Sequence, residues 1–218
     1  RAFQLAFRAA LPFLPYRNPE IISSDAEIPA VLRKNGIQKV MIVTDAGIRK
    51  LGLTSFLEKT MTEEGFGYCI YDRTVANPTI WNVEEAKDLY LKEGAQALIA
   101  FGGGSSMDCA KAAGARIVKP RQSIRQMKGL LKVHKKLPLL IAIPTTAGTG
   151  SETTLAAVIT DSEKHYKYPI NDFSLIPRYA VLDYHETVGL PKSITATTGM
   201  DALTHAVEAY IGGSTTRE

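Results

Sequence analysis

Apolar and polar residues follow two different periods along most of the chain. Apolar, partly β-branched runs of strand length occur at 39–44, 67–71, 97–101 and 139–144, with a shorter candidate at 180–183. Between them lie stretches with helical periodicity: from Asp45 to about Leu57, in 82–95 with Gly94 near its end, and from about Ser106 onward. Strands that alternate with helices predict parallel pairing through crossovers. We therefore expect an α/β fold with a doubly wound, mostly parallel, Rossmann-like sheet.

The last part of the chain has a different pattern. Proline and glycine punctuate residues 189–191, and residues 193–213 then have helical periodicity. We expect residues 1–184 to form the α/β domain and residues 185–218 to begin an all-helical domain whose remainder is absent. The chain starts with Arg rather than Met and stops just after the predicted helix, so we expect it to be a fragment.

Composition narrows the class of protein. Apolar residues make up 45% and charged residues 22% of the 218 residues, which is typical of globular proteins and excludes a disordered or collagen-like chain. No apolar run is long enough for a membrane span. The two cysteines, Cys69 and Cys109, cannot build a disulfide scaffold or a four-cysteine zinc site, which favours a reducing compartment. We expect a soluble, cytoplasmic protein.

Two segments carry unbalanced charge. Residues 1–14 are apolar with Arg1 and Arg8 and no acid, and Gln4 and Arg8 interrupt the apolar stretch that a secretory signal would need. We expect a packed or oligomer-contact helix there, with a transit peptide as the alternative. Residues 119–136 contain seven basic residues and no acidic one. No aromatic residues are interleaved with them, so we expect an exposed helix and loop and no nucleic-acid partner.

Four unusual loops follow predicted strands. They contain Asp45, Asn77, the triple glycine 102–104 and the double threonine 145–146. Ligands of an open parallel sheet bind where loops leave the carboxyl ends of the strands. We expect these four loops to converge at one edge of the sheet.

The glycine-rich loop is a candidate phosphate site. Glycines allow close backbone approach, and the start of the next helix offers free N–H groups and a positive dipole end. The sequence GGGSSMD at 102–108 matches neither the standard Rossmann fingerprint nor a P-loop. The alternative is a turn with Ser105 or Ser106 as N-cap and Asp108 in the first helical turn.

Asp45 and the threonine loop also allow two interpretations. The carboxylate of Asp45 can accept hydrogen bonds from an adenosine ribose diol and would repel a 2′-phosphate, or it can cap the following helix. The loop PTTAGTGSE at 144–152 has enough hydroxyls and glycines to line a polar ligand, although solvated turns use the same residues. Ser151 lies in no nucleophile elbow, so serine hydrolysis is not expected.

Asp201 and His205 form a candidate metal site. They are spaced i and i+4, so on a helix they share one side, from which a carboxylate and an imidazole can bind one divalent ion. Glu208 lies close to Asp201, and Leu203, Val207 and Tyr210 fall on the opposite face. The alternatives are a capping box formed by Thr198 and Asp201 and a polar but structural role for His205. The other histidines, His134, His165 and His185, are expected to be solvated.

Taken together, these motifs resemble the iron-containing (group III) alcohol dehydrogenases, which are kin to glycerol dehydrogenase and dehydroquinate synthase. The resemblance extends from about Pro19 to the end of the chain. Its motifs are VTDAG at 43–47, ANPT at 76–79, FGGGSSMDCAK at 101–111, PTTAGTGSE at 144–152, ITDSEKHYKYPI at 159–170 and GMDALTHAVEAY at 199–210.

The resemblance implies roles for residues at matching positions. Asp45 would hold the adenosine ribose of NAD, and Asp201 and His205 would be two ligands of a divalent metal, Fe²⁺ or else Zn²⁺. In the family two later histidines complete that site, and they would lie beyond Glu218. The remaining dinucleotide contacts would come from Asn77, Gly103, Gly104, Ser105, Asp108, Thr145, Thr146, Thr149, Thr154 and Lys167.

The implied activity is hydride transfer between a small alcohol, aldehyde or ketone and NAD(H), with a metal polarising the substrate oxygen. The resemblance also implies a homo-oligomer, with residues 1–184 binding the dinucleotide and residues 185–218 opening the metal and substrate domain. We expect no catalysis from these 218 residues alone. Two alternatives stay open: a non-catalytic nucleotide-binding or assembly module, and an NAD- and zinc-dependent lyase similar to dehydroquinate synthase.

Overall fold

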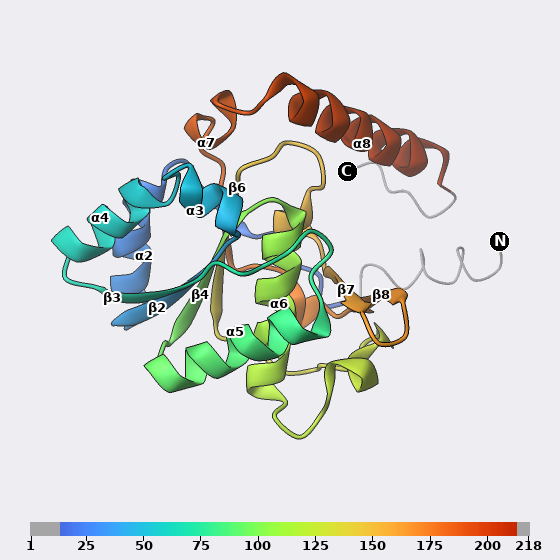
Figure 1. The fold of residues 1–218 in the computed structure, drawn as a ribbon, viewed down its shortest axis with the longest axis horizontal. Helices are drawn as coiled ribbons and strands as arrows, with labels where there is room; N and C mark the ends of the chain where they lie inside the picture. Colours follow the sequence, from blue (N-terminus) through green and yellow to red (C-terminus); the bar gives the residue numbers. More distant parts are fainter. Residues whose placement is uncertain (1–13, 213–218) are drawn as a thin grey trace.

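The computed structural model describes residues 14–212, and its main feature is a parallel sheet of six strands (Figure 1). The spatial order is β1–β9–β6–β4–β2–β3, and every neighbouring pair is parallel. The strands are β1 (Glu20–Ile22), β2 (Lys39–Val43), β3 (Gly67–Tyr71), β4 (Ala97–Gly102), β6 (Leu139–Pro144) and β9 (Tyr179–Val181). The predicted doubly wound α/β fold is confirmed.

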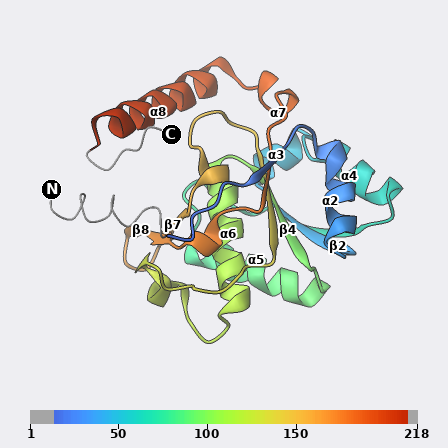
Figure 2. The ribbon, with the colours of Figure 1, turned by 180° about the vertical axis from the view of Figure 1, so that it is seen from behind.

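Helices cover both faces of this sheet. Figures 1 and 2 show α2, α3 and α4 over one face and α5 and α6 over the other. The α-helices are α2 (Ile28–Lys34), α3 (Ala46–Lys50), α4 (Ser55–Glu63), α5 (Ile80–Glu93), α6 (Gly104–Val118), α7 (His185–Val188) and α8 (Lys192–Ile211). Short 3-10 helices lie at Asp25–Glu27, Ile124–Met127, Ser151–Thr153 and Phe173–Leu175. No helix among residues 14–212 is long and apolar enough to cross a membrane.

The core is split into two layers by the alternation of side chains along each strand. In β2, Val40 and Ile42 pack with α2 and α4, whereas Met41 and Val43 pack with α5 and α6. The central strands are therefore apolar at nearly every position, since both faces are covered. This explains why continuous apolar runs in the sequence predicted the central strands, whereas the edge strand β1, of which only Ile22 is buried, was not predicted.

A second sheet, which the sequence pattern did not predict, packs beside α6. It consists of β5 (Gly129–Leu130), β8 (Tyr166–Asn171) and β7 (Ala156–Asp161), in that order. β7 and β8 form an antiparallel hairpin, and β7 lies against α6. Buried positions alternate along β7, and β8 contains Pro169, which disfavours an internal strand. The signal in the sequence was correspondingly weak.

Helix boundaries differ from the prediction at two places. The continuous helix expected up to Leu57 is wrong: α3 ends at Lys50, and α4 begins at Ser55 after a turn in which Gly52 has a φ of 71°. The helix expected at 82–95 spans 80–93, because Thr79 caps it with Asn82 as a capping box. Gly94, with a φ of 64°, ends it in the left-handed conformation as predicted.

α8 extends further toward its N-terminus than expected. It begins at Lys192, so Thr198 lies inside the helix and donates a hydrogen bond to the carbonyl of Ile194 at 2.9 Å. The capping box proposed for Thr198 and Asp201 is therefore wrong. The side chains of Leu203, Val207 and Tyr210 are 54%, 50% and 88% exposed, so none of the described residues covers that apolar face.

The basic run is only partly an exposed helix and loop. Arg125 donates to the two carboxylate oxygens of Asp161 at 2.6 and 2.9 Å and also pairs with Glu163. The ammonium of Lys128 lies 4.3 Å from the ring centroid of Tyr166. These contacts tie the segment before β5 to the β7–β8 hairpin.

Asp161→Asn is expected to make the fold less stable at neutral pH and less sensitive to acid. The hydrogen bonds from Arg125 lower the pKa of Asp161 to about 2. A carboxyl group whose pKa is lowered on folding stabilises the protein above its unfolded pKa, and this stabilisation is lost as pH falls toward the folded pKa. Thermal unfolding followed by circular dichroism between about pH 5 and about pH 2 measures the effect.

The matched control is Asp88→Asn, which removes a carboxylate that is 70% exposed beside Lys87. The melting temperature of this variant should follow that of the unmodified protein at every pH. Equal acid dependence in the Asp161→Asn variant and the unmodified protein would contradict the role given to the Arg125–Asp161 pair.

Candidate functional site

The loops that follow β3, β4 and β6 meet at the carboxyl edge of the main sheet, as expected. The amide of Asn77 donates to the hydroxyl of Ser105 at 3.2 Å, and the amide of Thr145 donates to the carbonyl of Gly102 at 3.1 Å. The loop after β2 joins them, because a Cβ atom on Gly102 would lie 3.0 Å from the side chain of Ile48 in α3. Segments distant in sequence thus form one continuous polar rim.

The three glycines between β4 and α6, which include the last residue of β4 and the first of α6, have different roles. Gly102 has a φ of 146°, and a Cβ atom there would lie 2.6 Å from the hydroxyl of Ser106. On Gly103 and Gly104, a Cβ atom would lie 3.4 and 3.2 Å from the side chains of Thr146 and Thr149. Gly102 therefore serves the turn itself, whereas Gly103 and Gly104 keep the space between the two loops free of side-chain atoms.

The N-terminus of α6 opens into this space. Gly103 is the N-cap residue and no side chain caps the helix, so the alternative with Ser105 or Ser106 as N-cap is wrong. Asp108 also lies beyond the first turn, which contains no acidic residue. An uncapped helix start with small residues around it leaves backbone N–H groups available to an anion.

Asn77 and Lys167 extend the rim toward the β7–β8 hairpin. Asn77 has a φ of 58°, and its side-chain oxygen accepts a hydrogen bond from the ammonium of Lys167. The two residues line a depression together with Thr160 and Tyr166. The hairpin thereby places a cation beside Asn77, whose amide contacts Ser105 in the first turn of α6.

Asp45 caps α3, as the structural interpretation expected. Its Oδ1 atom accepts hydrogen bonds from the amides of Gly47 and Ile48 at 2.8 and 3.0 Å. Its Oδ2 atom accepts none from the described residues, and the side chain is only half-buried. Capping therefore occupies one oxygen and leaves the other free, so the two interpretations of Asp45 are compatible.

A buried lysine that the sequence analysis did not single out fixes the threonine loop. Lys111 in α6 is 0% exposed, and its ammonium donates to five oxygens at 2.7 to 3.3 Å. These acceptors are the carbonyl and hydroxyl oxygens of Ser151 and Thr154 and the carbonyl oxygen of Ala156. The hydroxyl of Thr154, a predicted cofactor contact, is thus engaged within the protein.

Asp108 completes this buried network. Its carboxylate accepts hydrogen bonds from the hydroxyl of Ser151 at 3.2 Å and from the amide of Val158 at 3.0 Å. Burial raises the pKa of Asp108, against the charge of Lys111. Burial lowers the pKa of Lys111 to about 8, against the charges of Asp108 and Glu152. The opposite charges fix the segment after the threonine loop to α6.

Signals for this network were present in the sequence. Lys111 interrupts a run of small apolar residues, with Ala110, Ala112 and Ala113 beside it, in a helix between two layers. A charged residue at such a position needs buried partners. Only the tertiary structure identifies them, because they are mainly backbone carbonyls of a distant loop.

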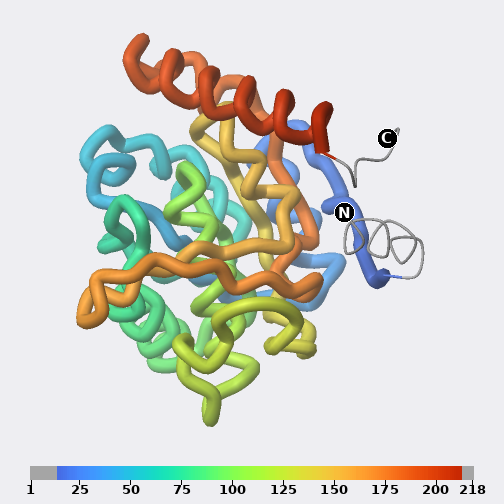
Figure 3. Tube along the Cα trace, turned by 90° about the vertical axis from the view of Figure 1, so that its right-hand side faces the viewer, coloured from blue at the N-terminus to red at the C-terminus, as the bar shows by residue number. Residues whose placement is uncertain are grey.

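The threonine loop also contacts α8. A Cβ atom on Gly148 would lie 2.5 Å from the backbone carbonyl oxygen of Thr198, so only glycine permits this approach. Figure 3 shows α8 lying across the end of the molecule where this loop projects. On a helix, Asp201 and His205 lie within about 60° of Thr198. They are therefore on the side of α8 that faces the loop rather than on its far side.

Asp201 and His205 share one side of α8 as predicted. The Nε2 atom of His205 lies 3.8 Å from the Oδ1 atom of Asp201, and both side chains are about half exposed. Within residues 14–212 no third histidine, cysteine, aspartate or glutamate joins them in a cluster that could hold a metal. The described residues supply two donors of suitable chemistry.

Known proteins share this arrangement of motifs. Residues 20–184 match the family model described as iron-containing alcohol dehydrogenase. The chain belongs to this family. Among curated relatives, it is 40% identical over 190 residues to an NAD-dependent methanol dehydrogenase of Bacillus methanolicus, covering 87% of this chain and 50% of that protein. It is 41% identical to a lactaldehyde reductase of Escherichia coli (strain K12), covering 83% of this chain and 47% of that protein.

Solved structures also superpose well on this chain. A 1,3-propanediol oxidoreductase has a TM-score of 0.87 and 32% identity, covering 93% of this chain and 54% of that one. A sulfoacetaldehyde reductase of Bifidobacterium kashiwanohense, in complex with NAD⁺, has a TM-score of 0.78 and 29% identity, covering 89% of this chain and 52% of that one. The chain spans about half the length of the relatives it matches.

Lys111→Met is expected to lower the free energy of unfolding by about 3 kcal/mol, because it removes the donor that five oxygens share and leaves Asp108 without its counter-charge. Urea unfolding followed by circular dichroism measures the change. The control is Lys92→Met on the exposed side of α5, which should change stability by less than about 0.5 kcal/mol. Similar stabilities for the two variants would show that the network does not hold the fold together.

Proposed function

We propose that this protein contributes to an NAD(H)-linked, metal-dependent alcohol dehydrogenase that transfers a hydride between a small alcohol and NAD⁺, or back to the aldehyde or ketone. The contact between Gly148 and Thr198 carries this proposal. It joins the loop beside the glycine-rich turn to the helix that bears Asp201 and His205. A candidate dinucleotide site and a candidate metal site are thereby adjacent.

The dinucleotide assignments fit the shape of the rim. The pyrophosphate would lie at the N-terminus of α6, against Gly103, Gly104 and Ser105, where a Cβ atom on either glycine would enter the gap. The free Oδ2 atom of Asp45 would accept the ribose hydroxyls. The remaining contacts would come from the rim residues Asn77, Thr145, Thr146, Thr149 and Lys167, while Asp108 and Thr154 would act through the network around Lys111.

The metal assignment fits the chemistry of the donors. A carboxylate and an imidazole at i and i+4 suit Fe²⁺ or Zn²⁺, and both side chains are accessible from the side of α8 that faces the loop. We place the domain division as before, with residues 1–184 binding the dinucleotide and residues 185–218 belonging to the metal and substrate domain. Further ligands would come from outside residues 14–212.

The residues of this chain would position the reactants. When bound, the metal would supply Lewis acidity that lowers the pKa of the alcohol. The threonine loop, fixed beneath by Lys111, would orient the nicotinamide end of the cofactor toward α8. No side chain of this chain is required as a covalent nucleophile. We further propose a homo-oligomeric, cytoplasmic enzyme with small alcohol or aldehyde substrates.

His205→Ala tests the metal assignment. In the enzyme reconstituted with ferrous or zinc ion, we expect metal content and turnover to fall by at least about tenfold, because one ligand of the ion is lost, while NADH binding changes little. Metal analysis and NADH fluorescence titration measure the two properties. The neighbouring variant Thr204→Ala should retain both. Full metal content in an inactive His205→Ala enzyme would reject the ligand role.

Asp45→Ser tests the ribose assignment. Serine can still cap α3, so the helix is kept while the negative charge is removed. We expect the ratio of kcat/KM with NADP(H) to that with NAD(H) to rise about tenfold, since repulsion of the 2′-phosphate is relieved. Steady-state kinetics with both cofactors measure the ratio. A preference for NADP(H) in the unmodified enzyme would overturn this assignment.

A further inference from the structure

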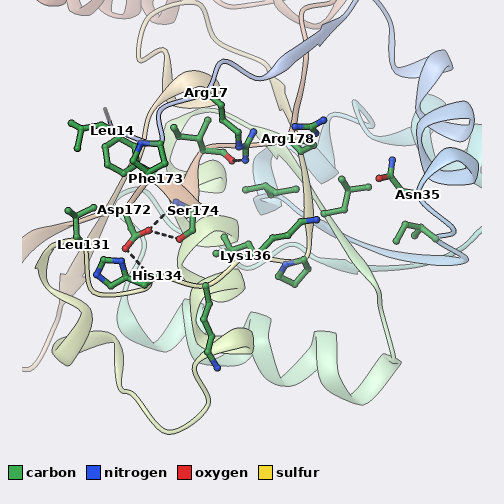
Figure 4. Close-up of a pocket in the computed structure, with 18 residues that line it drawn as sticks. Leu14, Arg17, Asn35, Leu131, His134, Lys136, Asp172, Phe173, Ser174 and Arg178 are labelled. Carbon is green, nitrogen blue, oxygen red and sulfur yellow. Dashed lines mark hydrogen bonds between the residues drawn. The ribbon is translucent and has the colours of Figure 1, made fainter. Parts of the chain in front are cut away.

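A second cleft lies at the edge of the sheet opposite to the dinucleotide rim (Figure 4). Its volume is about 790 Å³, which is in the range of small-molecule sites. Ile37 precedes β2, Leu139 opens β6 and Arg178 precedes β9. The cleft is therefore at the amino ends of the strands, whereas the candidate cofactor loops follow their carboxyl ends.

Basic side chains from three separate segments line this cleft. They are Arg17, His134, Lys135, Lys136 and Arg178. The one acidic residue among the lining residues is Asp172, and donors of the protein already surround it: the amides of Val133, His134 and Ser174 and the hydroxyl of Ser174, at 2.7 to 3.1 Å. These hydrogen bonds outweigh burial and lower the pKa of Asp172. Asp172 thus accepts hydrogen bonds that hold segments of the wall together. No other lining residue is acidic, so the basic side chains have no counter-charge there.

Two arginines are held close together without an acid between them. The guanidinium of Arg17 donates to the carbonyls of Pro177, at 2.7 Å, and Ile176. Burial and the charge of Arg178 lower the pKa of Arg17. Arg178 itself is exposed, and its guanidinium makes no ion pair within the described part of the chain. Like charges held at short range are unfavourable unless an anion binds between them.

The basic residues of the segment 119–136 have different roles in the fold. Arg125 and Lys128 hold the β7–β8 hairpin. Lys135 and Lys136 are exposed and point to no acid among residues 14–212. Of the basic residues of this segment that make no ion pair within residues 14–212, Lys135 and Lys136 line the cleft, whereas Arg121 and Lys132 lie outside it.

Most of the other lining residues are apolar, with Asn35 and Ser174 as polar exceptions. Leu131, Leu140, Phe173 and Ile176 lie between the basic groups, as Figure 4 shows for Leu131 and Phe173. An inorganic anion would leave this surface without a partner. A molecule with a planar or apolar body and a charged end would contact both parts of the wall.

We propose that this cleft binds a phosphate-bearing small molecule of the nucleoside diphosphate class, with its phosphates between Arg17, Arg178 and Lys136 and its base against the apolar wall. A guanidinium group can donate two parallel hydrogen bonds to the oxygens of one phosphate, so the two neighbouring arginines suit a phosphate-bearing ligand. The site is separate from the candidate dinucleotide rim, so both can be occupied together.

Calorimetric titration with ADP at low salt, in the presence of saturating NADH, tests this proposal. NADH blocks the rim, so binding of one further ADP per chain is expected. Arg178→Gln and Lys136→Gln should each raise the Kd for ADP about tenfold, and added salt should weaken binding. The matched control is Arg121→Gln, which removes an exposed charge of the same basic run outside the cleft. The Kd of this variant should be unchanged.

Chemical acylation of lysine side chains, measured by mass spectrometry with and without ADP, locates the ligand by an independent method. ADP should protect Lys135 and Lys136 but not Lys132, which is exposed outside the cleft. Three results would overturn the proposal: no ADP binding once NADH is saturating, equal Kd values in all four proteins, or protection of Lys132 to the same degree. None of these results depends on turnover, so the proposal stands or falls separately from the dehydrogenase activity.

Discussion

The rim of this protein depends on one buried ammonium group. Lys111 reaches from the middle of α6 to five oxygens in the segment 151–156, where its ammonium adds to the local hydrogen bonds that Thr154 donates to the carbonyls of Ser151 and Ala156. Without it, the chain would leave β6 as a glycine- and threonine-rich loop with little to hold it. With it, the loop is fixed to the same helix whose N-terminus faces the gap. One helix thus provides both an uncapped N-terminus at the gap and the anchor of the opposite wall.

This anchoring has a consequence for α8. The helix has no buried residue and meets the α/β body through the close approach of Thr198 to Gly148. Its position relative to the rim is therefore set by the loop that Lys111 fixes. The network around Asp108 and Lys111 is therefore connected through the threonine loop to the helix that carries Asp201 and His205. The approach of Gly148 to Thr198 thus connects the α/β body to α8.

Sequence alone predicted the parts of the fold governed by local patterns. The strands at 39–43 and 139–144 were clear because both of their faces are buried, and Gly94 marked a helix end through its own backbone preference. The β7–β8 hairpin was missed because only alternate residues are buried and Pro169 lies within it. Lys111 and Gly148 were missed as individual site residues for another reason. Their roles arise from contacts with residues distant in sequence, which no local pattern encodes.

The pattern of charge along the sequence also does not predict where the charged side chains lie in the fold. The seven basic residues between 119 and 136 are one feature in the sequence, but the fold separates them. Arg125 is neutralised by a buried aspartate, whereas Lys135 and Lys136 are placed beside arginines from two other segments. A run of charged residues therefore does not predict a single binding surface, because some of its residues form ion pairs that stabilise the fold. Where an anion would bind therefore depends on which members the fold brings beside cations from other segments: Lys135 and Lys136 lie with Arg17 and Arg178 at the edge of the sheet away from the candidate cofactor loops, whereas Arg121 and Lys132 do not.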